Sequence, residues 1–158
     1  MGHTPIIHQR TRKHKKVSAI AALCIDADGG LRLLFRLHPD ANIDKHRVRS
    51  FLRGLLRSVA GPIILIWDRL HAHRSGEAQR VIRTTRRLQT YLLPAYAPEL
   101  NPVEYLWSYL KVNPLANRPF YDVDTIARSA RNAARRVQKQ PNLLQSFLDQ
   151  CPLSFWNK

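Results

Sequence analysis

The chain has 158 residues and carries 26 lysines and arginines against 11 aspartates and glutamates, a formal charge of +15 at neutral pH. Hydrophobic residues make up 44% of it, which is ordinary for a globular domain and excludes disorder as an account of the whole chain. A basic excess of this size, spread along the chain, favours a polyanionic partner such as nucleic acid over a merely solubilising surface.

The cysteines and the apolar runs of the sequence indicate in which cellular compartment the protein is expected. Cys24 and Cys151 lie far apart and lack the paired spacing of a zinc site or a disulfide framework. The longest apolar runs, at 17–25 and 61–67, fall well short of the roughly 20 residues that a membrane span needs, and no signal-peptide pattern opens the chain. We therefore expect one soluble domain in the cytoplasm.

The first part of the chain predicts a hairpin and then a helix. A basic stretch at 8–16 precedes a β-like run at 17–25, and an alternating run at 31–37 follows the turn signal "DADGG". The segment 45–59 spaces its apolar residues as a helix does, with arginines on the opposite face. The two runs are expected to pair as antiparallel strands with this helix packed on them.

The middle of the chain predicts a parallel strand, helix and strand. "IILIW" at 63–67 has the continuous apolar character of a strand buried on both faces. A basic helix is expected at about 75–86 and the next strand at 88–94, and this alternation is typical of parallel pairing.

Two helices are expected after the second parallel strand. The first starts near Asn101 and is closed by the Asn-Pro pair at 113–114. The second is amphipathic and covers 124–139, with Asp124 as its N-cap.

Two of the acidic residues differ from the others, which are explained as turn, cap and surface residues. Asp68 immediately follows the buried strand, and catalytic groups in α/β sheets gather at the carboxyl ends of such strands, although a strand-end cap is the alternative. Glu104 fits the reach-back position of a capping box that starts at Asn101, and local physics alone favours this interpretation. Two carboxylates at one edge of a sheet can, however, bind divalent metal. Two metal ions about 4 Å apart can stabilise both the attacking and the leaving oxygen of a phosphodiester displacement.

Two blocks of the sequence, "ILIWDRLHAHRS" and "LLPAYAPELNPVEYLWSYLK", resemble the second half of the DDE transposase domain of the IS630/Tc1/mariner superfamily. The resemblance runs from about Gly2 to Lys139. Its second block is the more specific, with matches at Pro94, Tyr96, Pro98, Leu100, Asn101, Pro102, Glu104 and Trp107. The resemblance implies an α/β fold of the RNase H-like type, a mixed sheet flanked by helices, over residues 1–140, and a C-terminal tail at 141–158.

The resemblance also implies roles for single residues. Asp68 matches the second catalytic acid of the family and Glu104 the third, so both are implied catalytic residues and ligands of Mg²⁺ or Mn²⁺ in a two-metal site. His73 and Asn101 are implied to support them. Arg69 departs from the family, which commonly has asparagine at that position.

A further implication of the resemblance is that the first strand and its catalytic aspartate are missing. The chain starts, with "GHTP" at 2–5, inside a stretch that follows this strand in the family. Asp26 and Asp28 are poor substitutes because they lie in the hairpin turn. We therefore expect a partial transposase domain with weak or no strand cleavage alone, and a sheet edge open to another polypeptide.

The partner that the resemblance implies is DNA, both transposon ends and target, bound by a protein associated with the bacterial nucleoid. A homo-oligomer is implied for the complete domain, and an upstream transposase fragment is a further expected partner. The basic side chains expected to bind phosphates lie in the N-terminal stretch and the second helix: Arg10, Arg12, Lys13, Lys15, Lys16, Arg80, Arg83, Arg86 and Arg87. The last helix adds Arg128, Arg131, Arg135 and Arg136.

Two alternatives stay open. The first is a non-catalytic basic protein that holds DNA phosphates without reading sequence. The second is a basic interaction protein of unrelated fold, in which Glu104 is only a helix cap.

Overall fold

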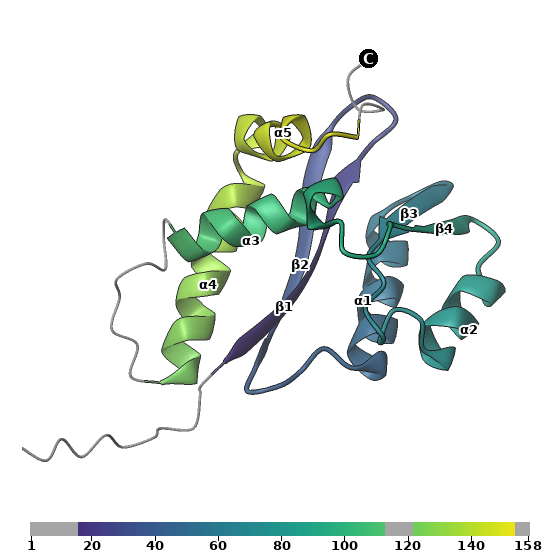
Figure 1. Cartoon of the computed structure of the whole chain (residues 1–158), viewed down its shortest axis with the longest axis horizontal. Helices are drawn as coiled ribbons and strands as arrows, with labels where there is room; N and C mark the ends of the chain where they lie inside the picture. The colour runs from purple at the N-terminus through teal and green to yellow at the C-terminus, as the bar shows by residue number, and fades with distance from the viewer. Residues whose placement is uncertain (1–15, 113–121, 154–158) are drawn as a thin grey trace, which may run out of the picture.

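A computed structural model describes residues 16–112 and 122–153 (Figure 1). The elements of this part of the chain are, in order, β1 (Val17–Ile25), β2 (Leu31–Pro39), α1 (Lys45–Ser58), β3 (Ile63–Trp67), α2 (Gly76–Thr84), β4 (Leu88–Leu92), the 3₁₀ helix η1 (Pro98–Leu100), α3 (Pro102–Val112), α4 (Val123–Gln138) and α5 (Pro141–Asp149). The β1–β2 hairpin crosses the middle of the molecule, with α3, α4 and α5 on one side and β3, β4, α1 and α2 on the other (Figure 1). No helix in the described ranges is long and apolar enough to cross a membrane.

The hairpin of β1 and β2 is antiparallel and in continuous register. At the ends of its ladder, the N–H of Asp40 donates to the carbonyl of Lys16 and the N–H of Asp26 donates to that of Gly30, both at 2.9 Å. Because hydrogen-bonded residues alternate in an antiparallel ladder, the even-numbered residues of β1 bond to β2 and the odd-numbered ones turn their backbone groups to the opposite side. Pro39 pairs with an odd-numbered residue, where its missing N–H costs nothing.

The second pair, β3 and β4, is parallel, as the alternation of strand, helix and strand predicts. Between α1 and β3 the chain turns at Gly61, whose φ of 71° suits glycine. Arg87, just before β4, fastens this turn because its guanidinium donates to the carbonyls of Leu56, Val59 and Gly61. The start of β4 is thereby fixed against the carboxyl end of α1.

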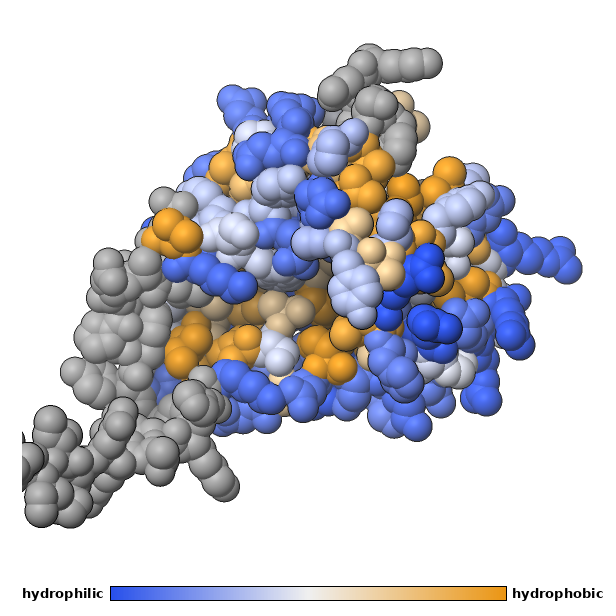
Figure 2. Space-filling model, viewed as in Figure 1, coloured by the Kyte–Doolittle hydropathy of each residue, from blue (hydrophilic) through white to orange (hydrophobic). Residues whose placement is uncertain are grey.

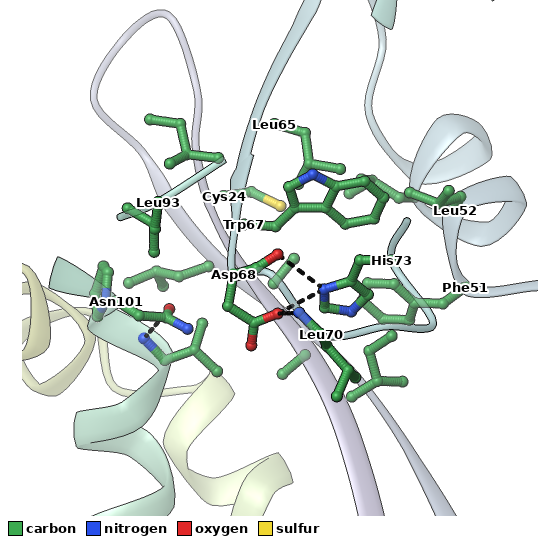
Figure 3. A pocket seen from close by; sticks show the side chains of 18 of the residues that line it. Cys24, Phe51, Leu52, Leu65, Trp67, Asp68, Leu70, His73, Leu93 and Asn101 are labelled. Atoms are coloured by element: carbon green, nitrogen blue, oxygen red, sulfur yellow. Dashed lines mark hydrogen bonds and ion pairs between the residues drawn. The ribbon is translucent and has the colours of Figure 1, made fainter. Parts of the chain in front are cut away.

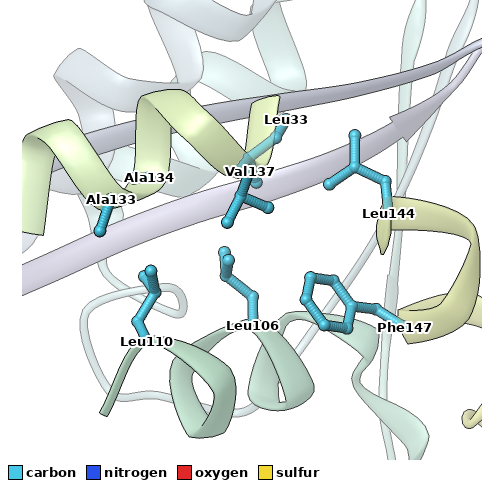
Figure 4. Packing of buried hydrophobic residues seen from close by; sticks show 8 residues of the cluster. All are labelled: Leu33, Leu106, Leu110, Ala133, Ala134, Val137, Leu144 and Phe147. Carbon is cyan, nitrogen blue, oxygen red and sulfur yellow. The ribbon is translucent and has the colours of Figure 1, made fainter. Parts of the chain in front are cut away.

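Side chains of β1 reach two separate hydrophobic clusters. Ala21 and Leu23 pack against a cluster formed by β2, α3, α4 and α5 (Figure 4). Ile20 packs against the other cluster, which includes Val48 of α1 and Trp67 of β3. Successive side chains of a strand point to opposite faces, so one strand serves both halves of the core.

The two strand pairs are not hydrogen-bonded to each other within the described residues. Instead, β1 and β3 line a cavity of about 650 Å³, to which α1 and the start of α3 also contribute. Figure 2, viewed as Figure 1, shows patches of hydrophobic side chains at the surface near the middle of the molecule, with hydrophilic side chains between and around them. The fold is therefore an α/β structure in which two small sheets flank an apolar gap.

The N-cap of α4 differs from the sequence prediction. The cap is Asp122 and not Asp124, because the carboxylate of Asp122 accepts hydrogen bonds from the N–H of Thr125 at 2.7 Å and from its hydroxyl at 2.6 Å. Asp122 has the extended backbone of a capping residue, whereas Asp124 already lies in the first helical turn. There its charge still complements the helix dipole.

Part of the predicted C-terminal tail is ordered. Residues 141–149 form α5, which starts with a proline in its first turn and buries Leu144, Phe147 and Leu148. Leu144 and Phe147 join the same cluster as α3 and β2 (Figure 4). The boundary at residue 140 stays a prediction, and the packing places α5 with the elements that precede it.

Replacing Leu144 with alanine tests this packing. Leu144 is fully buried, so the variant should lower the free energy of unfolding by about 2–5 kcal/mol through lost transfer energy and a cavity. Urea denaturation followed by circular dichroism measures the change. Val112→Ala is the control, because that side chain is 69% exposed and its loss should cost less than about 0.5 kcal/mol. Equal effects of the two variants would contradict a core role for α5.

Candidate active site

Asp68 lies directly after β3, at the carboxyl end of the parallel pair, as the sequence predicts. Its Oδ1 accepts a hydrogen bond from the N–H of Leu70 at 2.9 Å and lies 2.7 Å from Nδ1 of His73 (Figure 3). The hydrogen bond from His73 is the main reason that the pKa of Asp68 is lowered; burial opposes it and the N–H of Leu70 assists. The carboxylate is thus held ionised by one oxygen, while Oδ2 has no hydrogen bond to a described residue.

His73 is fixed in place on both sides. Its ring stacks on Trp67 with the centroids 4.6 Å apart and the planes 9° from parallel (Figure 3). Its backbone N–H donates to the carbonyl of Leu70 at 2.8 Å, which closes a tight turn behind Asp68. The side chain of His73 is only 11% exposed, so it orients Asp68 from within the core.

Glu104 is in the first turn of α3, where Asn101 begins the helix by accepting a hydrogen bond from the N–H of Val103 at 3.2 Å. The capping-box interpretation of Glu104 is wrong, because the N–H of Asn101 that it requires donates to the carbonyl of Pro98 at 3.0 Å. The carboxylate of Glu104 has no hydrogen bond or ion pair with any described residue. Burial raises the pKa of Glu104, Lys111 works in the opposite direction, and the charge of Asp68 adds to the increase.

The structure brings Asp68, Glu104 and Asn101 to one place. All three line the large cavity, and all three also line a smaller one of about 190 Å³. Because the charge of Asp68 raises the pKa of Glu104, the two carboxylates are close enough to repel each other. Such a pair attracts a cation.

The described residues contain no group of three or more histidine, cysteine, aspartate or glutamate side chains placed to hold a metal ion. Asp26 stays in the hairpin turn, where it forms an ion pair with Arg32 at 2.7 Å. Cys24 and Cys151 are both free. The carboxylates of the site in this part of the chain are therefore Asp68 and Glu104.

The predicted phosphate-binding residues fall into three groups. Arg80, Arg83 and Arg86 are exposed on and just after α2. Arg87 donates hydrogen bonds to the three carbonyls described above, and these bonds explain its position without DNA. Lys16 donates to Oδ1 of Asn42 at 2.6 Å. The remaining four lie outside the described residues: Arg10, Arg12, Lys13 and Lys15.

Two residues beside the carboxylates were not assigned to the site by the sequence. Tyr96 lines the smaller cavity, has a left-handed φ of 57° and exposes its whole side chain. A tyrosine in this region is uncommon. Its signals in the sequence are its match to the family block and its place between two prolines in "PAYAP", and neither assigned it a role. Arg69 lines the same cavity and donates through Nε to the carbonyl of Leu93 at 2.9 Å, so it ties the ends of β3 and β4 together.

The fold and the site define an α/β domain with a carboxylate pair at the carboxyl end of a parallel strand pair. A sequence model of the family described as DDE superfamily endonuclease matches residues 1–127, and the chain belongs to this family. A relative, uncharacterized protein y4pE/y4sA of Sinorhizobium fredii (strain NBRC 101917 / NGR234), is 30% identical over 106 residues, which are 66% of this chain and 76% of the relative.

Among solved structures, the crystal structure of the Mos1 mariner paired end complex with Mn is similar, with a TM-score of 0.56 and 16% sequence identity. The match covers 93% of this chain and 47% of that one, so this chain spans about half the length of the mariner chain. This structural similarity confirms the predicted RNase H-like fold class. Together with the family match, it confirms the resemblance to DDE transposases of the Tc1/mariner type.

Replacing His73 with alanine should raise the pKa of Asp68, because it removes the hydrogen bond that lowers this pKa most and leaves the burial that raises it. Titration of the aspartate carboxyl groups by carbon-13 NMR measures the effect. His71→Ala is the matched control, since His71 is exposed and forms no hydrogen bond or ion pair with Asp68 in the described structure. An unchanged pKa in the His73 variant would contradict the proposed orientation of Asp68.

The same variant changes the dependence of stability on pH. A lowered pKa in the folded chain means that Asp68 stabilises the fold above the ordinary aspartate pKa and loses this contribution as pH falls through the lowered value. His73→Ala should therefore lose less stability than the parent chain over that acidic window.

Proposed function

We propose that this chain is part of the catalytic domain of an insertion-sequence transposase, which breaks and joins DNA phosphodiesters with the help of a divalent metal. The observation that carries the proposal is the placement of Asp68 and Glu104 on the same two cavities, in a member of the DDE endonuclease family. Asp68 and Glu104 are the proposed catalytic and metal-binding residues, and His73 and Asn101 position them.

The chemistry of the donor atoms fits a hard divalent cation. Oδ2 of Asp68 and the carboxylate of Glu104 form no hydrogen bonds with described residues, and carboxylate oxygens are the ligands that Mg²⁺ and Mn²⁺ prefer. The description of the mariner structure as a complex with Mn supports the same class of ion. A metal held by Asp68 and Glu104 would activate the attacking oxygen and neutralise charge at the phosphodiester.

The residues of this chain contribute orientation and charge. His73 keeps Asp68 ionised and directs its free oxygen away from the histidine ring. Burial raises the pKa of Glu104, and a cation held beside it would lower that pKa again. Exposed Tyr96, which lines the smaller cavity, offers a face on which a DNA base can stack.

The arginines of α2 and α4 support DNA as the partner. Arg80, Arg83 and Arg86 are exposed, and α4 exposes its arginines on the side opposite its buried alanines: Arg128, Arg131, Arg135 and Arg136. We infer contacts to the phosphates of transposon ends and target DNA, at the bacterial nucleoid. The description of the similar mariner structure as a paired end complex supports transposon ends as the ligand. A homo-oligomer is the proposed form of the complete assembly.

We further propose that residues 1–158 cleave DNA weakly or not at all without a third carboxylate. The described residues supply two, and the two-metal displacement of the family is implied to need three. An upstream transposase fragment is the proposed source of the third.

Metal binding tests the site directly. Asp68→Asn and Glu104→Gln should each weaken Mn²⁺ binding by at least about tenfold, since even residues that only orient metal ligands commonly cost that much. Titration of free Mn²⁺ by electron paramagnetic resonance gives the affinity. Glu99→Gln is the matched control because Glu99 is exposed, lies five positions before Glu104 and does not line either cavity. If all three variants bind Mn²⁺ as the parent chain does, the proposed site is wrong.

The second candidate function is non-catalytic DNA binding, which the exposed arginines favour independently of the carboxylates. Arg83→Ala and Arg86→Ala should each weaken binding to duplex DNA similarly for all sequences and lower the slope of log affinity against log salt by about 1. Fluorescence anisotropy with two unrelated duplexes at several salt concentrations measures this.

Glu104→Gln separates the two candidate functions in the same assay. An affinity that depends on divalent metal in the parent chain and not in Glu104→Gln supports the transposase site. An affinity that is identical in both proteins, with or without metal, supports the non-catalytic alternative.

A further inference from the structure

The larger cavity is bounded on two sides by strand edges. Residues 19–25 of β1 and 63–67 of β3 both line it. Within the described residues β1 pairs only with β2, and β3 pairs only with β4. We call the space between these two edges the strand slot.

The hydrogen-bonding pattern of β1 identifies the backbone groups that face the strand slot. Since the even-numbered residues bond to β2, the N–H and carbonyl groups of Ala19, Ala21 and Leu23 point away from β2. These groups therefore line one long side of the slot.

The pattern of β3 gives the other side. The N–H of Ile63 donates to the carbonyl of Arg87 at 2.7 Å, and the N–H of Leu93 donates to that of Trp67 at 2.8 Å. In a parallel ladder with this register the odd-numbered residues of β3 bond to β4, so the backbone groups of Ile64 and Ile66 face the slot. A backbone N–H or carbonyl group that is buried beside apolar side chains costs free energy unless it has a hydrogen-bond partner.

The two edges run in opposite directions. Ile20, near the start of β1, belongs to the same cluster as Trp67, at the end of β3. At the other end, Arg32, which pairs with Cys24, donates to the carbonyl of Ser58 at 3.1 Å, and Ser58 ends α1 in the chain before β3 begins at Ile63. A strand placed between them antiparallel to β1 is therefore parallel to β3.

The walls of the slot above and below this plane are apolar. Val48 and Leu52 of α1 line the slot, and so do Val103 and Trp107 of α3. A hydrocarbon or other apolar small molecule would fill such walls but would leave both rows of backbone groups unpaired. An extended polypeptide can make apolar contacts with the walls and backbone hydrogen bonds with both strand edges at the same time.

We propose that the strand slot binds one extended apolar segment of another polypeptide, which hydrogen-bonds to β1 and β3 and joins the two strand pairs into one sheet. Antiparallel pairing with β1 is favoured because β1 is the longer edge, with nine residues against five, and antiparallel pairing is slightly more stable per residue. About five residues, roughly 16 Å of strand, suffice to pair with β3 over its whole length.

This orientation also places the carboxyl end of the bound strand at the end of β3, beside Asp68 and Glu104. A strand that ends in aspartate therefore brings a third carboxylate to the pair, and this part of the inference rests on the proposed function. The occupation of the slot itself does not depend on it.

The test uses the whole chain and a short synthetic peptide as the probe. Its central run alternates valine and isoleucine over about five residues and ends in aspartate, with lysines outside the run for solubility. Amide hydrogen exchange by NMR, with and without the peptide, is the readout. Binding should slow exchange at least tenfold at Ala19, Ala21, Leu23, Ile64 and Ile66. The amides of Ala22 and Leu65, which already belong to the ladders, are internal controls with little change.

The pattern of protection decides the outcome. Protection that does not alternate along β1, or that is confined to other elements, would overturn the proposal, as would no binding at all. Slow exchange at the odd-numbered residues of β1 without peptide, increasing with protein concentration, would overturn it too, because a second copy of the chain would then be the occupant.

Two proline variants add a matched comparison. Ala21→Pro removes an N–H that faces the slot and leaves the ladder to β2 intact, so it should keep the circular dichroism spectrum and weaken peptide binding about tenfold or more. Ala22→Pro removes an N–H of the ladder and should instead lower the stability of the hairpin. If Ala21→Pro unfolds the chain, the exchange pattern of the parent protein still decides.

A peptide with asparagine in place of the terminal aspartate separates the two proposals. It should bind the slot about as well as the aspartate peptide, and only the aspartate peptide should strengthen Mn²⁺ binding. If both peptides protect the slot and neither affects Mn²⁺, the slot proposal stands and the role of the third carboxylate fails.

Discussion

The position of β1 between two hydrophobic clusters is the constraint on which the rest of the structure depends. Ala21 and Leu23 pack toward α3, α4 and α5, and Ile20 packs toward α1 and β3. Because a strand presents its side chains to two faces, β1 holds two otherwise separate halves together. Its backbone pairs on one edge only, with β2. The cavity beside the carboxylates follows directly from this arrangement.

The electrostatics of the site arise from two unlike environments. Asp68 is stabilised in its charged form by His73, which stacking on Trp67 keeps in place. Glu104 is partly desolvated, has no hydrogen-bond partner among the described residues and is destabilised in its charged form by burial. The pKa of Asp68 is thus lowered and that of Glu104 raised, so Glu104 gains the more from a nearby cation. A site of this kind is incomplete without positive charge, which agrees with the divalent metal implied for a DDE endonuclease.

Local patterns in the sequence predicted most elements because their ends are marked by strong signals. The bounds of β3 agree with the prediction, since its continuous apolar run lies between Gly61-Pro62 and Asp68. The start of α3 at Pro102 was equally clear. The cap of α4 was misplaced because two aspartates two positions apart both suit an N-cap, and only the backbone conformation distinguishes them. The packing of α5 went unrecognised although its leucines and phenylalanine have helical spacing.

By itself, the sequence determined the order of strands and helices apart from η1 and α5, and it placed Asp68 at a strand end and Glu104 in a first helical turn. These features depend on short-range periodicity and turn residues. Only the tertiary structure decided that Glu104 is no cap, since the N–H it would need is bonded within η1. It also decided that Arg87 serves the turn after α1, and that β1 and β3 face each other without pairing. These outcomes depend on which distant backbone groups meet, and no local pattern encodes that.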